Sequence, residues 1–205
     1  MIRNIVFDMG QVLIHWTASL YAGTFGLCPE DEKLLKHEMF GRGKTEWVSM
    51  DEGTLDPEQV VEGVCARLPE RLHPCVREIT ENWWNIQLCP MEGMGDLVRE
   101  LKDKGYRIWL LSNAALSLRT YFPRIPGSDC FDGLYVSAEH KLLKPDRAIY
   151  RSFLDAFSLK GEECFFIDDR QENIDGAALE NIRGVVFTGD AQVLRRDLKA
   201  AGVRL

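Results

Sequence analysis

The sequence predicts an α/β fold with a doubly wound, mostly parallel Rossmann-like sheet and an inserted small helical cap domain. Short, near-continuous apolar runs recur along the chain, and amphipathic segments of helical length separate most of them. Such runs are typical of parallel strands buried on both faces, and their alternation with helices favours right-handed crossovers. The expected strands are residues 2–7, 106–111, 134–136, 164–167 and 185–187.

The expected helices follow from apolar periodicity and from glycines that stop it. A glycine just past a helical pattern is a common C-terminal signal, and Gly105 and Gly202 stand in such positions. The expected helices of the sheet domain are residues 94–104, 146–157, 171–181 and 190–201.

The stretch from residue 15 to 87 has helical spacing and no convincing strand, and we expect breaks in it at 51–54 and 72–74. We expect a catalytic core of residues 1–14 and 88–205, with residues 15–87 as a helical cap. Because the insertion follows the first strand, its ends emerge at the ligand-binding edge of the sheet. The cap is therefore placed to exclude water from a site there.

Composition limits the partners of the protein. The 205 residues carry a formal net charge of -7, which argues against nucleic-acid binding. Six cysteines form no Cys-x-x-Cys pair and follow no secretory leader, so we expect a reducing, cytoplasmic location. No apolar stretch approaches the roughly 20 residues of a membrane helix. We expect a monomer or a weak homodimer.

Polar residues stand just beyond four of the expected strands, in a set suited to one chemistry. Asp8 follows the first strand, and the later positions are Ser112-Asn113, Lys144-Pro145-Asp146 and Asp168-Asp169. A nucleophilic carboxylate, a hydroxyl, an ammonium and an acidic pair suit phosphoryl transfer. Taken singly, each has an ordinary structural explanation as a turn, a helix start or a helix cap. The ordered set favours the functional interpretation.

These motifs resemble those of the haloacid dehalogenase superfamily. The likeness spans the chain and lies in Phe7-Asp8-x-Gly10, Leu111-Ser112-Asn113, Lys144-Pro145-Asp146 and Ile167-Asp168-Asp169, followed by Asn173-Ile174. Within the superfamily, the sequence is most similar to the branch with a small helical cap. That branch includes bacterial glucose-1-phosphate phosphatases and the phosphatase domain of soluble epoxide hydrolase. The resemblance implies a Mg²⁺-dependent phosphatase that acts on a small phosphorylated metabolite.

The resemblance also implies a role for each motif residue. Asp8 would attack phosphorus to form an aspartyl phosphate, and it would ligate Mg²⁺ together with the Gly10 carbonyl and Asp169. Asp168 would be a direct or water-mediated partner of the ion.

The phosphoryl group has its own implied contacts. Ser112, with Asn113 nearby, would hydrogen-bond a phosphoryl oxygen, and Lys144 would place positive charge against both that group and Asp8. Asn173 would brace the acidic loop.

Gly10 departs from the pattern of most phosphatases in the superfamily, which carry a second Asp there as general acid and base. Loss of this general acid is expected to slow the reaction by about 10²- to 10⁴-fold. It predicts a preference for leaving groups that depart easily, such as the sugar of an aldose 1-phosphate. His15, His140 or a cap residue could replace the acid, although an isolated His is more often structural.

The cap is expected to select the substrate. The segment 40–44 joins glycines to two cations, and Trp47, Trp83 and Trp84 could stack on a sugar, although helix packing is the more common role of such aromatic residues.

Two other functions remain open from the sequence. One is a 2-haloacid dehalogenase-type hydrolase, in which the Asp attacks carbon and the position of Gly10 is also non-acidic. Against it, Gln11-Val12 differs from the dehalogenase pattern at this point, and Asp168-Asp169 suit a metal that dehalogenation does not use. The other is a catalytically impaired protein that binds a phosphorylated ligand.

Overall fold

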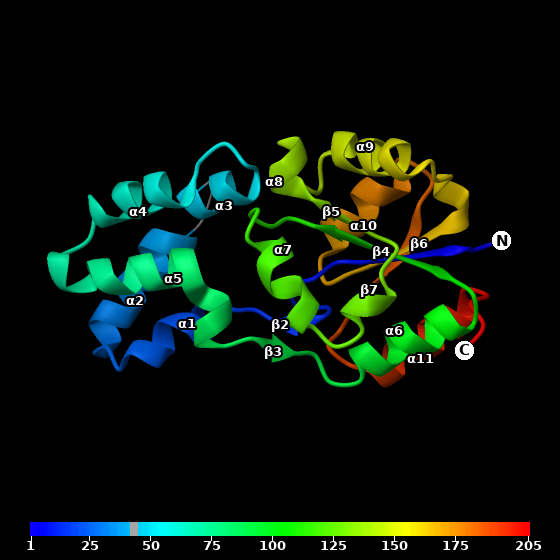
Figure 1. Cartoon of the computed structure of the whole chain (residues 1–205), viewed down its shortest axis with the longest axis horizontal. Helices are drawn as coiled ribbons and strands as arrows, with labels where there is room; N and C mark the ends of the chain where they lie inside the picture. Colours follow the sequence, from blue (N-terminus) through cyan, green and yellow to red (C-terminus); the bar gives the residue numbers. More distant parts are fainter. Residues whose placement is uncertain (42–44) are drawn as a thin grey trace.

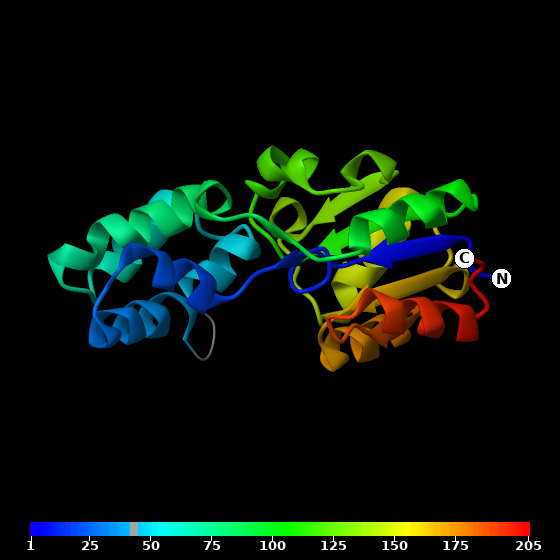
Figure 2. The ribbon, with the colours of Figure 1, turned by 90° about the horizontal axis from the view of Figure 1, so that it is seen from below.

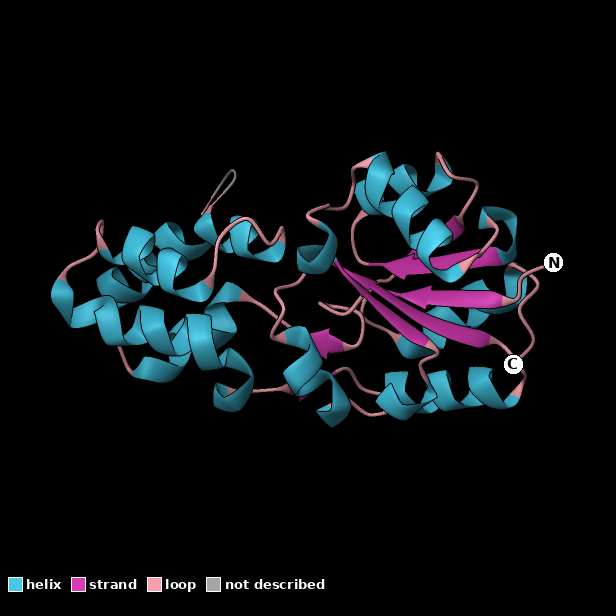
Figure 3. Cartoon of the chain, turned by 45° about the horizontal axis from the view of Figure 1, so that its top comes forward, coloured by secondary structure: helices cyan, strands magenta, loops and turns pink. Residues whose placement is uncertain are grey.

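The computed structural model describes residues 1–41 and 45–205. Its larger part is a five-stranded sheet with helices on both faces, and a bundle of helices lies beyond one end of the strands (Figures 1 and 3). Both termini lie at the opposite end of the sheet (Figure 1). The α/β, Rossmann-like fold class predicted from the sequence is confirmed.

The sheet has the order β5-β4-β1-β6-β7, and all neighbouring strands are parallel. From β1 the chain builds outward through β4 and β5, then returns to the other side of β1 with β6 and β7. This reversal places a topological switch point beside β1, where open α/β sheets bind ligands at the carboxyl ends of their strands. Each predicted strand is present with slightly shifted ends: β1 (Asn4–Phe7), β4 (Arg107–Ser112), β5 (Gly133–Val136), β6 (Cys164–Asp168) and β7 (Arg183–Val186).

Helices cover both faces of the sheet because successive strand residues point to opposite sides. The four predicted helices are present as α6 (Met94–Asp103), α9 (Arg147–Phe157), α10 (Gln171–Ala178) and α11 (Ala191–Ala200). In β1, Ile5 and Phe7 pack on the side of α6 and α11, whereas Val6 packs on the side of α9 and α10. Short helices α7 (Leu118–Tyr121) and α8 (Ser137–His140) follow β4 and β5.

The bundle consists of α1 (Ala18–Ala22), α2 (Pro29–Phe40), α3 (Glu46–Asp51), α4 (Pro57–Cys65) and α5 (His73–Ile86). Figure 2 shows the bundle as a separate lobe that two connecting segments of the chain join to the sheet. These connections pair as β2 (Ile14–His15) and β3 (Cys89–Pro90), a short antiparallel ladder that the sequence did not predict. Two-residue strands carry too little alternation to be recognised from a pattern.

The lobe and the sheet domain share one apolar cluster, in which Trp83 of α5 contacts Tyr121 of α7 with ring centroids 4.6 Å apart. Single-turn 3₁₀ helices complete the described fold at Gly23–Phe25, Glu70–Leu72, Phe122–Arg124, Ser128–Cys130 and Gly161–Glu163. None of the described helices is both long and apolar enough to cross a bilayer.

Candidate active site

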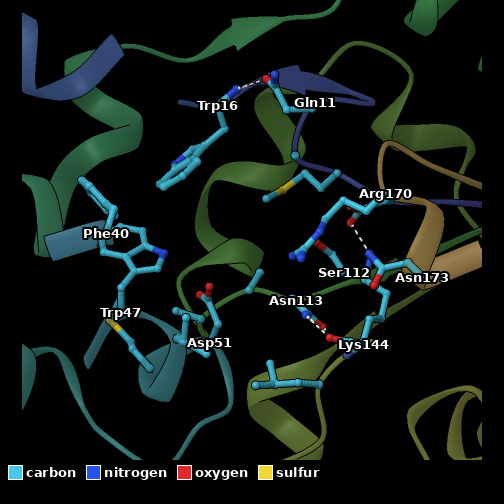
Figure 4. A pocket seen from close by; sticks show the side chains of 18 of the residues that line it. Gln11, Trp16, Phe40, Trp47, Asp51, Ser112, Asn113, Lys144, Arg170 and Asn173 are labelled. Atoms are coloured by element: carbon cyan, nitrogen blue, oxygen red, sulfur yellow. Dashed lines mark hydrogen bonds and ion pairs between the residues drawn. The ribbon is translucent and has the colours of Figure 1, made fainter. Parts of the chain in front are cut away.

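A cavity of about 560 Å³ lies at the carboxyl edge of the sheet, between the sheet and the bundle. Its floor comes from the ends of β1, β4 and β6 and from the loop before α9. Its opposite wall comes from the bundle and the segment after β2 (Figure 4). The lining includes Asp8, Gly10, Gln11, Ser112, Asn113, Lys144, Asp169, Arg170 and Asn173 from the sheet domain, and Trp16, Phe40, Trp47, Asp51 and Trp83 from the other side.

The floor is built on a buried lysine between two carboxylates. Asp8 directly follows β1, and its backbone N–H donates to the Ile167 carbonyl at 2.9 Å. Lys144 Nζ lies 2.9 Å from Asp8 Oδ1 and 2.7 Å from Asp168 Oδ2. All three side chains are buried. A buried cation between two anions is stable only with partners this close, so these two contacts hold together the ends of β1 and β6 and the loop before α9.

Asn113 holds Lys144 in place through its side-chain amide. The Lys144 backbone N–H donates to Asn113 Oδ1 at 2.8 Å, and Asn113 Nδ2 donates to the Lys144 carbonyl at 3.0 Å. These backbone groups lie in a loop and need partners. The amide that the sequence placed near a phosphoryl oxygen is therefore engaged with the lysine loop. Ser112, the last residue of β4, is also buried and lines the cavity.

Asp168 serves as an anchor for the acidic loop. Its Oδ1 accepts from the Arg170 backbone N–H at 2.9 Å and from Asn173 Nδ2 at 2.8 Å, while Oδ2 faces Lys144. Both of its oxygens are thus engaged within the protein. Asp169, the next residue, is half-buried and lines the cavity.

The site carries more negative than positive charge. Burial raises the pKa of Asp8 to about 7; Lys144 opposes this shift, and the neighbouring Asp168 adds to it. Burial and Asp168 also raise the pKa of Asp169. Burial lowers the pKa of Lys144, but Asp8 and Asp168 outweigh it and the net shift is upward, so the lysine is charged. A further cation would relieve the excess charge.

The donor set fits a divalent metal ion. Asp8, Asp168 and Asp169 each offer a carboxylate oxygen, and these oxygens lie within 4.8 Å of one another. Asp8 Oδ1 is buried, and its close partner among the described residues is the Lys144 ammonium at 2.9 Å. Oxygen-only ligands of this kind suit Mg²⁺. Because Asp168 is engaged elsewhere, Asp8 and Asp169 are the available carboxylates, and Gly10 lies beside them in the lining.

The other residues singled out in the sequence are dispersed. Trp47 and Trp83 line the cavity, whereas Trp84 stacks on Tyr121 with ring centroids 5.5 Å apart. His15 and His140 are exposed and are not among the described residues of the lining. Of the segment 40–44, Phe40 and Gly41 line the cavity, and residues 42–44 lie outside the described part of the chain.

Several lining residues were not predicted from the sequence, among them the polar or aromatic residues Gln11, Trp16, Asp51 and Arg170. Gln11 and Arg170 lie within three residues of predicted site residues and could have been found from that adjacency. Gln11 Oε1 accepts the Trp16 backbone N–H at 2.8 Å, which holds the segment entering the bundle against the floor (Figure 4). Asp51 carries no local signal, because it reaches the cavity only through the packing of α3.

This chain resembles curated proteins in sequence and solved structures in fold. The chain is 25% identical to the sesquiterpene phosphatase astK of Aspergillus oryzae over 189 residues, covering 91% of this chain and 90% of that protein. It is 24% identical to the drimenol cyclase drtB of Aspergillus calidoustus over 209 residues, but spans only 36% of that protein.

Among solved structures, a HAD family enzyme of Bacteroides thetaiotaomicron in complex with magnesium and inorganic phosphate superposes with a TM-score of 0.74. That match has 21% identity and covers 95% of this chain and 99% of the other. An L-2-haloacid dehalogenase of Xanthobacter autotrophicus superposes with a TM-score of 0.66 at 15% identity, covering 100% of this chain and 85% of the other. At these identities the structural matches establish the fold.

A family model resolves the classification. The model of haloacid dehalogenase-like hydrolases matches residues 2–179, which include all four motifs and the helical bundle. The resemblance recognised in the sequence is confirmed: the chain belongs to the haloacid dehalogenase-like hydrolase family.

Proposed function

We propose that the protein is a Mg²⁺-dependent phosphatase that hydrolyses the phosphate monoester of a small metabolite through an aspartyl phosphate on Asp8. The observation that carries this proposal is the buried Asp8 carboxylate, with Lys144 at 2.9 Å and Asp169 beside it at the floor of a cavity. The sesquiterpene phosphatase relative and the structural neighbour that holds magnesium and phosphate support the same reaction.

The site residues divide the work of the reaction. An Asp8 carboxylate oxygen attacks phosphorus, the bond to the alcohol oxygen breaks, and water later hydrolyses the aspartyl phosphate to release inorganic phosphate. The Lys144 ammonium keeps Asp8 oriented and places positive charge beside the transferring group, and the Ser112 hydroxyl donates to a phosphoryl oxygen. Mg²⁺, held by Asp8, Asp169 and the Gly10 carbonyl, supplies charge neutralisation when bound.

The alcohol part of the substrate would lie against an aromatic wall, formed by Trp16, Phe40, Trp47 and Trp83. The ring centroids of Trp16 lie 5.4 Å from those of Phe40 and of Trp47, so the wall is a continuous apolar surface. Such a surface accommodates either the apolar face of a sugar, including an aldose 1-phosphate, or a hydrocarbon. We infer a substrate with an apolar face. The screen below compares the two kinds of alcohol, sugars and hydrocarbon alcohols.

Removing Mg²⁺ is expected to abolish phosphate release. The test is a screen of aldose 1-phosphates, sugar 6-phosphates, acyl phosphates and prenyl phosphates with Mg²⁺ and with EDTA, measured as inorganic phosphate. Asp169→Asn should raise the Mg²⁺ concentration needed for half-maximal activity, whereas Asp175→Asn, a surface carboxylate of α10 paired with Gln171, should not. Halide release from 2-chloropropionate without Mg²⁺ would instead identify a dehalogenase. Ligand binding without turnover would identify a binding protein.

Trp16→Ala is expected to raise KM about 10-fold for the preferred substrate of the screen. Loss of a partly buried indole removes apolar contact worth about 1–3 kcal/mol. KM for acetyl phosphate, which is too small to cover the wall, should change little. Trp84→Ala is the control, because Trp84 packs in the same aromatic cluster, on Trp83 and Tyr121, but is not among the described residues that line the cavity. Equal effects of both substitutions on KM would show that the wall only stabilises the bundle.

A further inference from the structure

The floor of the cavity contains no acid at the position of Gly10. A Cβ built on Gly10 would meet no atom within 4 Å, and the backbone there has no left-handed conformation that would demand glycine. The space for a Cβ is therefore open at this position, and the sequence has no acid there. A leaving alkoxide needs a proton, so a phosphatase with this floor needs a donor from another element.

Asp51, the last residue of α3, faces the cavity from the opposite side. Figure 4 shows its carboxyl group between Trp47 of the bundle and Asn113 of the sheet domain. In-line displacement at phosphorus requires the leaving oxygen to lie opposite the attacking oxygen of Asp8. A substrate on Asp8 would direct its leaving oxygen toward the bundle side, where Asp51 lies.

The contact between α3 and the sheet domain is close enough to hold this carboxyl group in position. Ser137 Oγ, at the start of α8, donates to the Asp51 carbonyl. Two residues further on, Gly53 has a φ of +76°, and a Cβ there would lie 2.2 Å from the Ala138 carbonyl oxygen. Only glycine allows this approach, so the end of α3 is fitted against α8.

The surroundings of Asp51 favour its protonated form. Burial raises its pKa well above the ordinary value and the nearby Asp8 adds to this, while the Ala115 backbone N–H and the Trp47 side chain oppose the shift as hydrogen-bond donors. The Tyr121 hydroxyl also interacts electrostatically with Asp51. A carboxylic acid that keeps its proton near neutral pH can donate it to a leaving group.

We propose that Asp51 is the general acid of this enzyme and that the cap supplies the proton that Gly10 cannot. The inference rests on the proposed phosphatase function. In the first step, an oxygen of Asp8 bonds to phosphorus and the bond to the alcohol oxygen breaks. The electron pair of that bond goes to the alcohol oxygen, which takes the Asp51 proton and leaves as the neutral alcohol.

The second step restores both carboxyl groups. The Asp51 carboxylate takes a proton from water as the water oxygen bonds to phosphorus, and the bond between phosphorus and Asp8 breaks. Inorganic phosphate, the Asp8 carboxylate and protonated Asp51 result. With a donor in the cap, the enzyme is not confined to leaving groups that depart unaided.

Two substrates of similar shape test the proposal through kcat/KM, which covers the steps up to alcohol release. The leaving group of 4-nitrophenyl phosphate departs without a proton, whereas that of 2-phenylethyl phosphate requires one. For Asp51→Asn we expect a loss of about 10²- to 10⁴-fold on 2-phenylethyl phosphate and a much smaller loss on 4-nitrophenyl phosphate. Asp31 pairs with Arg71 in the bundle and is not among the described residues that line the cavity. Asp31→Asn should therefore change kcat/KM on neither substrate.

A second variant separates catalysis from structure. Gly10→Asp in the Asp51→Asn background should restore at least part of the activity on 2-phenylethyl phosphate, because it places an acid in the open position of the floor. Equal losses of kcat/KM on both substrates, no loss on either, or failure of rescue would overturn the assignment of Asp51. Inactivity of the wild-type enzyme with Mg²⁺, or full activity of Asp8→Asn, would instead overturn the phosphatase function itself.

Discussion

Asp8→Asn is expected to reduce phosphate release by about 10³-fold or more. The substitution keeps the shape of the side chain but removes the nucleophilic oxygen and one metal ligand. The neighbouring Asp168 cannot take over, because Lys144, Arg170 and Asn173 engage both of its carboxylate oxygens. The loss should therefore apply to good and poor leaving groups alike, in contrast to that of Asp51→Asn.

The measurement is acid-quenched labelling as well as steady-state turnover. Wild-type enzyme mixed with radiolabelled substrate should give up to one labelled phosphoryl group per chain, and Asp8→Asn should give none. Asp96→Asn, an exposed carboxylate in the first turn of α6, is the matched control and should label normally. Labelling that survives in Asp8→Asn would exclude Asp8 as the nucleophile.

The same substitution is expected to change the pH dependence of stability in the metal-free protein. The folded-state pKa of Asp8 is about 7, above its ordinary value of 3.8, so the native state binds this proton more tightly than the unfolded state. The stability gained from this proton is complete below about pH 4 and is lost as pH rises through about 7. In urea unfolding with EDTA, the free energy of unfolding of Asp8→Asn should rise relative to that of the wild type as pH increases from 5 to 8. An unchanged difference between the two proteins would contradict the raised pKa.

The sheet and most of its floor could be predicted from the sequence because both depend on local patterns. Buried parallel strands are near-continuous apolar runs, and a parallel topology brings their carboxyl ends to one edge. Asp8, Ser112 and Asp168 each stand at such an end, so finding the strands was enough to place them together. Lys144 stands farther from its strand, 134–136, and was placed at the same edge as one member of the ordered set of polar residues.

The remaining features depend on packing between elements that are distant in the sequence. Asp51 reads as the end of a helix at a turn, and its approach to Asp8 depends on how α3 fits against α8 at Gly53 and Ala138. The hydrogen bonds of the Asn113 amide are a similar case. The sequence shows that residue 113 is an asparagine, but not that its side chain pairs with the backbone of Lys144. Local periodicity carries no information about such contacts.

Lys144→Met is expected to lower the free energy of unfolding by about 3–5 kcal/mol and to abolish measurable turnover. Methionine can replace the aliphatic part of the side chain but leaves Asp8 and Asp168 buried without their shared cation. The first quantity is measured by urea unfolding and the second by phosphate release. Lys141→Met, in an exposed residue of the same loop, should change neither.

A double-mutant cycle separates the charge from the packing of the side chain. Combining Lys144→Met with Asp8→Asn removes one of the two buried carboxylates that lost their partner, so the double variant should be more stable than Lys144→Met alone. Asp168 keeps its hydrogen bonds from Arg170 and Asn173, which makes Asp8 the carboxylate with more to gain from neutralisation. Strict additivity of the two substitutions would mean that the 2.9 Å contact between Lys144 and Asp8 contributes no coupling energy. In that case the lysine would act only through Asp168.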